Sequence, residues 1–154
     1  MGAHDHTSKA ELHELHATAA ERLRVDDQRY TSSRRDLVEA LVAAERPPTI
    51  PELLVARPGL AQSSAYRNLA VLEQVGVVRR IVTSDEHARF ELAEDLTGHH
   101  HHLVCAVCGR VDDFTVSPSL ERSLDTALAR VAGETGFAVD HHRLDLVGTC
   151  KSCS

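Results

Sequence analysis

The chain has 154 residues, with 17 basic and 23 acidic side chains, a formal net charge of −6, 3% aromatic residues and no tryptophan. This length suits one ordinary domain or two small ones, and a small domain gains from a metal ion or a partner subunit because its core is thin. No apolar segment approaches the ~20 residues of a membrane-spanning helix. The polar start, with His4 and His6, lacks the apolar core of a signal peptide. We therefore expect no membrane association and a cytoplasmic location.

The charges divide the chain into two unlike halves. Residues 29–89 carry nine arginines against seven acidic residues, a net of +2, whereas residues 90–154 carry five basic against ten acidic residues, a net of −5. Such asymmetry suggests divided functions. The first half has the basic character that nucleic-acid binding needs, and the second half holds the cysteines and most of the histidines.

The first half begins with a run of helix signals. Residues 1–28 show leucines at helical spacing, which we interpret as an accessory helix or a partly ordered arm. Thr31-Ser32-Ser33 offers an N-cap for a helix that Pro47-Pro48 stops. Thr49-Ile50-Pro51-Glu52 is a capping box with proline in the first turn, so a second helix begins there.

A third helix and a hairpin complete this half. Ser63 or Ser64 is expected to cap the helix, and Gly76 is its natural left-handed C-cap. A β-rich segment at 77–82, a polar turn at 83–87 and a returning strand at 89–92 follow. Three short helices and a hairpin form the pattern of a winged helix-turn-helix.

The second half reads as a small α/β unit. Strands are expected at 100–104 and 110–116, on either side of a Cys-x-x-Cys-Gly turn, and a last strand at 143–147. Between them, Pro118 opens a helix that ends near Gly133 or Gly136. Its apolar stripe is expected to point inward and consists of Leu120, Leu124, Ala127, Leu128 and Val131. The predicted fold class is α+β, with a winged-helix domain and its helical arm at 1–92, a hinge at 93–98 and a metal-binding dimerisation domain at 99–154.

Two Cys-x-x-Cys pairs predict a structural zinc site. Cys105 and Cys108 form one pair, and Cys150 and Cys153 form the other. Each pair lets two thiolates hold one ion from a tight turn, and two pairs complete a tetrahedron with no open position. Cytosolic cysteines stay reduced, which disfavours disulfides. A redox dithiol is the rival interpretation.

Four consecutive histidines, His99 to His102, form a second metal-binding pattern. Side chains alternate along a strand, so His99 and His101 face one side and His100 and His102 the other. One tetrad can therefore contribute to two metal sites. Ligands from elsewhere would complete them, and the candidates are His87, Glu91, Asp95, Glu121, His141 and His142.

These motifs, in this order, resemble the ferric uptake regulator family of metal-dependent transcriptional repressors. The likeness extends from about Tyr30 to Cys153, with Tyr66-Arg67 similar to the recognition-helix signature and Phe90-Glu91-Leu92 preceding the histidines. It implies a homodimer that binds a double-stranded DNA operator, a pseudo-palindrome, and controls metal homeostasis genes. It also implies the four-cysteine zinc site and a second metal site of His99, His101, Glu121 and His142.

The resemblance further implies a regulatory site at the hinge, with Glu91, His100 and His102. The family often adds a histidine from the start of the second helix, where this chain has Pro47, so His87 in the wing turn is our candidate for the fourth ligand. The regulatory ion is expected to be Fe²⁺ or Zn²⁺, with Mn²⁺ or Ni²⁺ as alternatives. The expected DNA contacts are Ser64, Tyr66, Arg67, Arg79, Arg80 and Arg89.

Other functions remain open from the sequence. A peroxide-sensing repressor of the same family would be marked by iron-catalysed oxidation of a hinge histidine. A zinc-dependent hydrolase would need an open coordination position and a positioned base. A metal-storage module would have no use for the Tyr66-Arg67 helix. We expect a regulator and not an enzyme.

Overall fold

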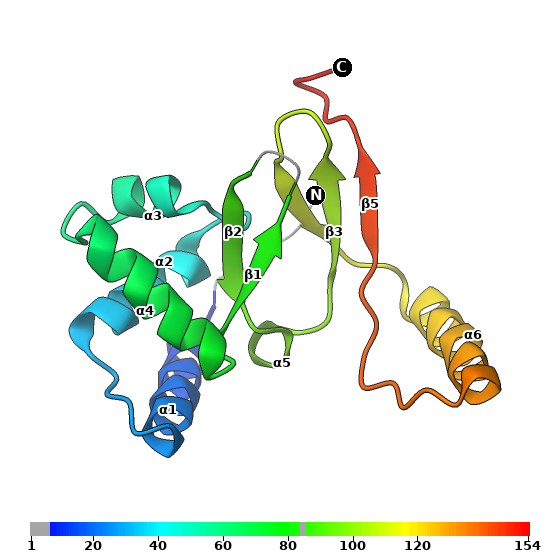
Figure 1. Cartoon of the computed structure of the whole chain (residues 1–154), viewed down its shortest axis with the longest axis horizontal. Helices are drawn as coiled ribbons and strands as arrows, with labels where there is room; N and C mark the ends of the chain where they lie inside the picture. The colour runs from blue at the N-terminus through cyan, green and yellow to red at the C-terminus, as the bar shows by residue number, and fades with distance from the viewer. Residues whose placement is uncertain (1–6, 84–85) are drawn as a thin grey trace.

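The computed structural model describes residues 7–83 and 86–154. Two modules lie side by side in it (Figure 1). Within these residues, the first module contains four helices and a two-stranded hairpin, and the second contains a three-stranded sheet and one long helix. The α+β class that the sequence predicts is confirmed. Where a hinge was expected, the chain forms a single helical turn, α5 (Glu94–Thr97).

The N-terminal helix α1 (Lys9–Val25) belongs to the core of the first module. Ser8 and Glu11 form a capping box at its start. Leu15, Ala19 and Leu23 are buried, because residues spaced three or four apart share one face of a helix. The interpretation as an accessory or partly ordered arm was therefore wrong for residues 9–25, whereas His4 and His6 lie outside the described residues.

Three further helices build the winged-helix core, namely α2 (Ser32–Ala43), α3 (Ile50–Ala56) and α4 (Gln62–Gln74). Thr31 caps α2, and the predicted capping box of Thr49 and Glu52 begins α3. The start of α4 was predicted wrongly. It begins at Gln62 after Ala61, which makes no side-chain cap, so both candidate serines lie in the first turn. Gly76 follows this helix at φ +75°, as expected.

The wing is the hairpin of β1 (Val78–Val82) and β2 (Ala88–Leu92). The strands are antiparallel, with Val78 opposite Leu92 and Arg79 opposite Glu91. The expected polar turn at 83–87 includes residues 84–85, which lie outside the described part. Side chains from the helices, together with Val77 just before β1, fill the core, and the helical ones include Leu23, Leu37, Leu53, Leu69 and Leu72.

The second module is a sheet of β3 (His101–Cys105), β4 (Val111–Phe114) and β5 (Asp145–Gly148). The order is β4-β3-β5, with β3 antiparallel to β4 and parallel to β5. The histidine strand is therefore central and paired on both sides. Its register places His102 between Asp113 and Asp145.

Helix α6 (Pro118–Thr135) crosses from β4 toward β5. Ser117 caps it, and Gly136 ends it in the left-handed conformation. The inward apolar stripe was wrong for the isolated chain: no residue of α6 is buried, and Leu120 and Val131 are 48% and 54% exposed. The helix lies to one side of the sheet (Figure 1). Among the described helices, none is long and apolar enough to span a bilayer.

Candidate metal centres

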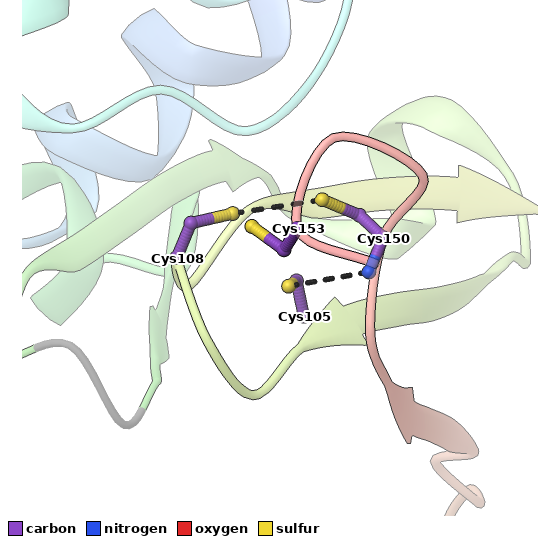
Figure 2. Close-up of side chains that lie close together, drawn as sticks. All are labelled: Cys105, Cys108, Cys150 and Cys153. Carbon is purple, nitrogen blue, oxygen red and sulfur yellow. Dashed lines mark hydrogen bonds between the residues drawn. The ribbon is translucent and has the colours of Figure 1, made fainter.

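The four cysteines converge at one end of the second sheet (Figure 2). Cys105 ends β3 opposite Gly148, which ends the parallel strand β5, so the turns that follow the two strands start side by side. Cys108 lies in the first turn, and Cys150 and Cys153 lie in the second. All four are free thiols, and their sulfur atoms lie within 4.8 Å of one another.

The spacing and electrostatics of this group fit a zinc ion. Sulfur atoms about 2.3 Å from a tetrahedral zinc ion are about 3.8 Å apart, and Sγ of Cys108 lies 3.8 Å from Sγ of Cys150. Backbone N–H groups, first that of Cys108 and then that of Cys150, lower the pKa of the Cys105 thiol. Cys153 makes hydrogen bonds to Cys150 and Cys108, and these raise the pKa of the Cys153 thiol to about 12. A divalent cation would relieve this crowding of sulfur atoms and favour the thiolates.

A second group joins the wing to the second sheet. Glu91 of β2 faces His100 and His102, with its Oε2 atom 3.0 Å from Nε2 of His100 and 3.1 Å from Nε2 of His102. Asp113 of β4 brings a further carboxylate, 3.9 Å and 3.7 Å from the same two nitrogens. Each residue offers one ligand atom, and the four atoms lie within 4.8 Å of one another.

The outer nitrogens of the two imidazoles are already engaged. Nδ1 of His100 lies 3.0 Å from the Gly98 carbonyl oxygen, to which it donates, and Nδ1 of His102 lies 3.2 Å from Asp145. Such contacts fix the ring so that Nε2 points at the group and can bind a metal ion. The donor set of two imidazoles and two carboxylates suits zinc, iron(II) or manganese.

Charge is concentrated at this group. Burial alone raises the pKa of Glu91, but hydrogen bonds from His100 and His102, with the positive charge of Arg79, outweigh it and hold that pKa well below its usual range. The hydrogen bond to Glu91 raises the pKa of His100 to about 9. Without a metal ion the group is thus held together by an imidazolium and a carboxylate, and a divalent cation has to replace a proton.

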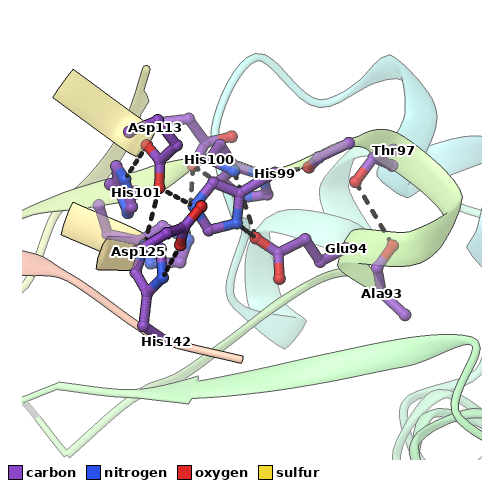
Figure 3. Close-up of polar contacts among 12 residues, drawn as sticks. Ala93, Glu94, Thr97, His99, His100, His101, Asp113, Asp125 and His142 are labelled. Carbon is purple, nitrogen blue, oxygen red and sulfur yellow. Dashed lines mark hydrogen bonds and ion pairs between the residues drawn. The ribbon is translucent and has the colours of Figure 1, made fainter. Parts of the chain in front are cut away.

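The other face of the histidine strand carries a third group, formed by His99, His101, Glu121 and His142. Glu121 of α6 is central: its oxygens lie 2.9 Å from Nε2 of His99, 3.0 Å from Nε2 of His101 and 2.8 Å from Nε2 of His142. Nε2 of His142 is buried and, although it lies close to Glu121, makes no hydrogen bond, so this nitrogen is well placed to bind a metal ion. Figure 3 shows these histidines and Glu94, which reaches from α5 to His99.

The structure separates His87 from the group that it was expected to complete. His87 precedes Glu91 by four positions in the wing, which corresponds to about 13 Å along an extended strand. Asp113 stands in the fourth position instead. The sequence contained a signal for it: pairing the two strands across the Cys-x-x-Cys-Gly turn brings Asp113 opposite His102.

The expected DNA contacts fall into two classes. Tyr66 is 55% exposed on α4, and Arg67 and Arg80 are exposed as well. In contrast, Arg79 pairs with Glu91, and Arg89 is only 8% exposed and donates to Oγ1 of Thr83 at 2.7 Å.

Ser64 is half-buried and accepts a hydrogen bond from Asn68 at 3.0 Å. The outward side chains thus remain candidates for DNA contacts. Arg79, Arg89 and Ser64 are engaged within the protein.

A winged helix joined to a sheet module with clustered cysteines and histidines defines a metal-responsive DNA-binding regulator. The family model for the ferric uptake regulator family matches residues 26–147. The chain is 33% identical to the peroxide operon regulator of Bacillus subtilis over 146 residues, covering 92% of this chain and 94% of that protein. The chain therefore belongs to the ferric uptake regulator family.

Solved structures agree with this assignment. A zinc-bound manganese uptake regulator is 30% identical, with a TM-score of 0.61 and coverage of 91% of this chain and 98% of that one. The ferric uptake regulator of Helicobacter pylori, 21% identical with a TM-score of 0.72 and coverage of 92% and 93%, shows the same fold. The protein is accordingly a metal-sensing transcriptional repressor and not an enzyme, which sets the hydrolase alternative aside.

Proposed function

We propose that the group of Glu91, His100, His102 and Asp113 is the regulatory metal site. The observation that carries the proposal is the position of Glu91: it belongs to the wing, whereas its three partners belong to the second module. An ion bound here fixes the angle between the modules. A ligand shifts an equilibrium only through its different affinities for two states, and a site built from both modules has this difference.

The four cysteines hold a permanent structural zinc ion in this proposal, because four thiolates leave no open position. The group around Glu121 is a second site within one module, so an ion there stabilises that module. The regulatory ion is iron(II) or zinc, with manganese or nickel as alternatives. The repressor acts in the cytoplasm, where its operator is.

The active form is a homodimer. Exposed apolar side chains gather on the second module, including Leu128, Val131, Phe137, Val139 and Val147. Strand β5 has one edge without a partner strand among the described residues. A second copy of the chain would cover these surfaces. Two recognition helices would then present Tyr66 and Arg67 to successive major grooves of a pseudo-palindromic operator that controls metal homeostasis genes.

The proposal is tested by DNA binding with and without metal. In the unmodified protein, metal should raise operator affinity by about 150-fold if the coupling free energy is near 3 kcal/mol. The double variant His100→Ala, His102→Ala is expected to lose this metal dependence. His13→Ala, an exposed histidine of α1, is the control and should behave as the unmodified protein. Metal dependence that persists in the double variant would contradict the proposal.

Peroxide sensing is the second candidate, because relatives at 32–33% identity are named as regulators of peroxide responses. In that case iron(II) at the regulatory group would promote oxidation of His100 or His102. Mass spectrometry of the iron-loaded protein after hydrogen peroxide would show one added oxygen atom on either histidine, together with loss of operator binding. An unmodified pair of histidines in protein that keeps its operator would exclude this candidate.

A further inference from the structure

The carboxylate of Glu91 is shared between two elements of the fold. Its Oε2 atom faces His100 and His102, whereas its Oε1 atom accepts hydrogen bonds from Arg79, from Nε at 2.8 Å and from Nη2. Arg79 and Glu91 are directly opposite each other in the wing hairpin. The contact is therefore set by the register of β1 and β2.

Arg79 is held in this place. Its side chain is 22% exposed and Glu91 is 8% exposed, so solvent screens the pair only in part. An arginine side chain in a protein carries a permanent positive charge. The positive charge of Arg79 and the atoms that would bind a divalent cation thus lie on opposite sides of the same Glu91 carboxylate. This charge repels a divalent cation and opposes its binding.

We infer that Arg79 is a specificity-determining residue of the Glu91 group and sets both its affinity and its preference among metal ions. Because Oε1 of Glu91 accepts two hydrogen bonds from Arg79, only Oε2 faces the two histidines, and Glu91 would offer this single oxygen to an ion. With one atom from each of the four residues, the group would supply four ligands. Four nitrogen and oxygen ligands satisfy zinc. Manganese prefers six, mostly oxygen, and would gain from a carboxylate free to offer both oxygens.

The inference rests on the proposed regulatory site and adds a role for a residue outside its ligand set. Arg79 thereby has a different role from the one that the sequence predicted, which was a contact with DNA. Its neighbour Arg80 points the other way, 51% exposed and 3.7 Å from Glu73. Substitution of either arginine removes one positive charge from the same strand, and only Arg79 touches Glu91.

The test is a direct titration of the full-length, cysteine-bound zinc form with zinc and with manganese in the presence of a competing chelator. Arg79→Met is expected to bind both ions more tightly, and to gain at least about tenfold more for manganese than for zinc. Arg80→Met should stay within about twofold of the unmodified protein for both ions. Zinc content and the thermal midpoint verify the fold, and Arg79→Gln is a second variant with the same expected direction.

Glu91→Gln separates this inference from the proposal beneath it. If Glu91→Gln binds as many ions as the unmodified protein, the regulatory site is wrong and the inference is overturned with it. If Glu91→Gln loses one ion while Arg79→Met keeps the unmodified ratio of manganese to zinc affinity, the inference alone is overturned. Weaker manganese binding in a folded Arg79→Met variant has the same consequence.

Discussion

The two faces of the histidine strand are close neighbours with different connections. His101 and His102 are adjacent, and both are almost fully buried, at 1% and 2% exposure. His101 meets Glu121 of its own module, whereas His102 meets Glu91 of the other module. Similar ligands one residue apart are therefore suited to different tasks: one site stabilises a module, and the other connects two modules.

The largest effect is expected where both faces depend on one feature, the cysteine group that follows β3. Cys153→Ser should remove the zinc ion and unfold the second module, because zinc binding is folding free energy, on the order of 10–16 kcal/mol in small zinc peptides. Metal binding at both histidine faces would be lost together. Elemental analysis and limited proteolysis measure this, with Ser152→Ala in the same turn as the control. Intact histidine sites in zinc-free protein would refute the dependence.

The sharpest comparison is between His101→Ala and His102→Ala. Both truncate a buried imidazole at the centre of the same strand, so their packing costs should be similar. His101→Ala is expected to lose the metal-induced rise in thermal stability of the second module, about 2.7 kcal/mol at 100 times the dissociation constant, and to keep metal-dependent operator binding. His102→Ala should do the reverse. Equal losses in both assays for both variants would mean that the faces are not separate.

The pH dependence of metal binding should distinguish the Glu91 group from the other two metal sites, because His100 carries a proton that a metal ion has to displace. The hydrogen bond to Glu91 raises the pKa of His100 from 6.5 to about 9, so below pH 9 a metal ion has to displace this proton. Apparent affinity should rise by up to about tenfold per pH unit from pH 7 to pH 9 and level off above that. In the metal-free protein, stability depends on pH with the opposite sign: the stability that comes from the raised pKa of His100 is complete below pH 6.5, as long as Glu91 stays ionised, and declines as pH rises through 9. Proton release by calorimetry, measured in two buffers, checks the first statement.

A smaller effect is expected at the connection between α1 and α5. Arg22 donates to the Gly76 carbonyl at 2.5 Å and pairs with Asp95, next to the Glu94 side chain that holds His99. The pair is partly exposed, so Arg22→Met should cost about 0.2–1 kcal/mol, less at high salt. Chemical denaturation with Arg24→Met as the control measures it. A salt-independent loss would point to packing instead of charge.

Local rules explain what the sequence predicts well. The capping box at Thr49 needs only a four-residue pattern, and the alternation of His99 to His102 needs only the period of a strand. Both the four-cysteine group and the Glu121 group assemble in the structure as expected. Spacing within a turn and order along the chain were sufficient for these features.

Features that depend on the register between strands, or on contacts with a second subunit, could not be predicted from such local patterns. Asp113 becomes a neighbour of His102 only through the register of β3 and β4, and Arg79 meets Glu91 only through that of the wing. The stripe on α6 is amphipathic by sequence, yet the part of the chain that the structure describes leaves every residue of this helix at least partly exposed. Ser63 and Ser64 were plausible caps, but α4 begins at Gln62, so both serines lie in its first turn and Ala61 stands at the N-cap without a side-chain hydrogen bond.

The central position of β3 also limits how the length of this protein can vary during evolution. Because side chains alternate with a period of two, one residue inserted between His102 and Cys105 would exchange the ligands of the two faces or displace the cysteine. The segment before His99 has no such restriction, since α5 and Gly98 lie outside the sheet. Homologous chains should therefore differ in length before the histidines and keep the spacing from His102 to Cys105 constant.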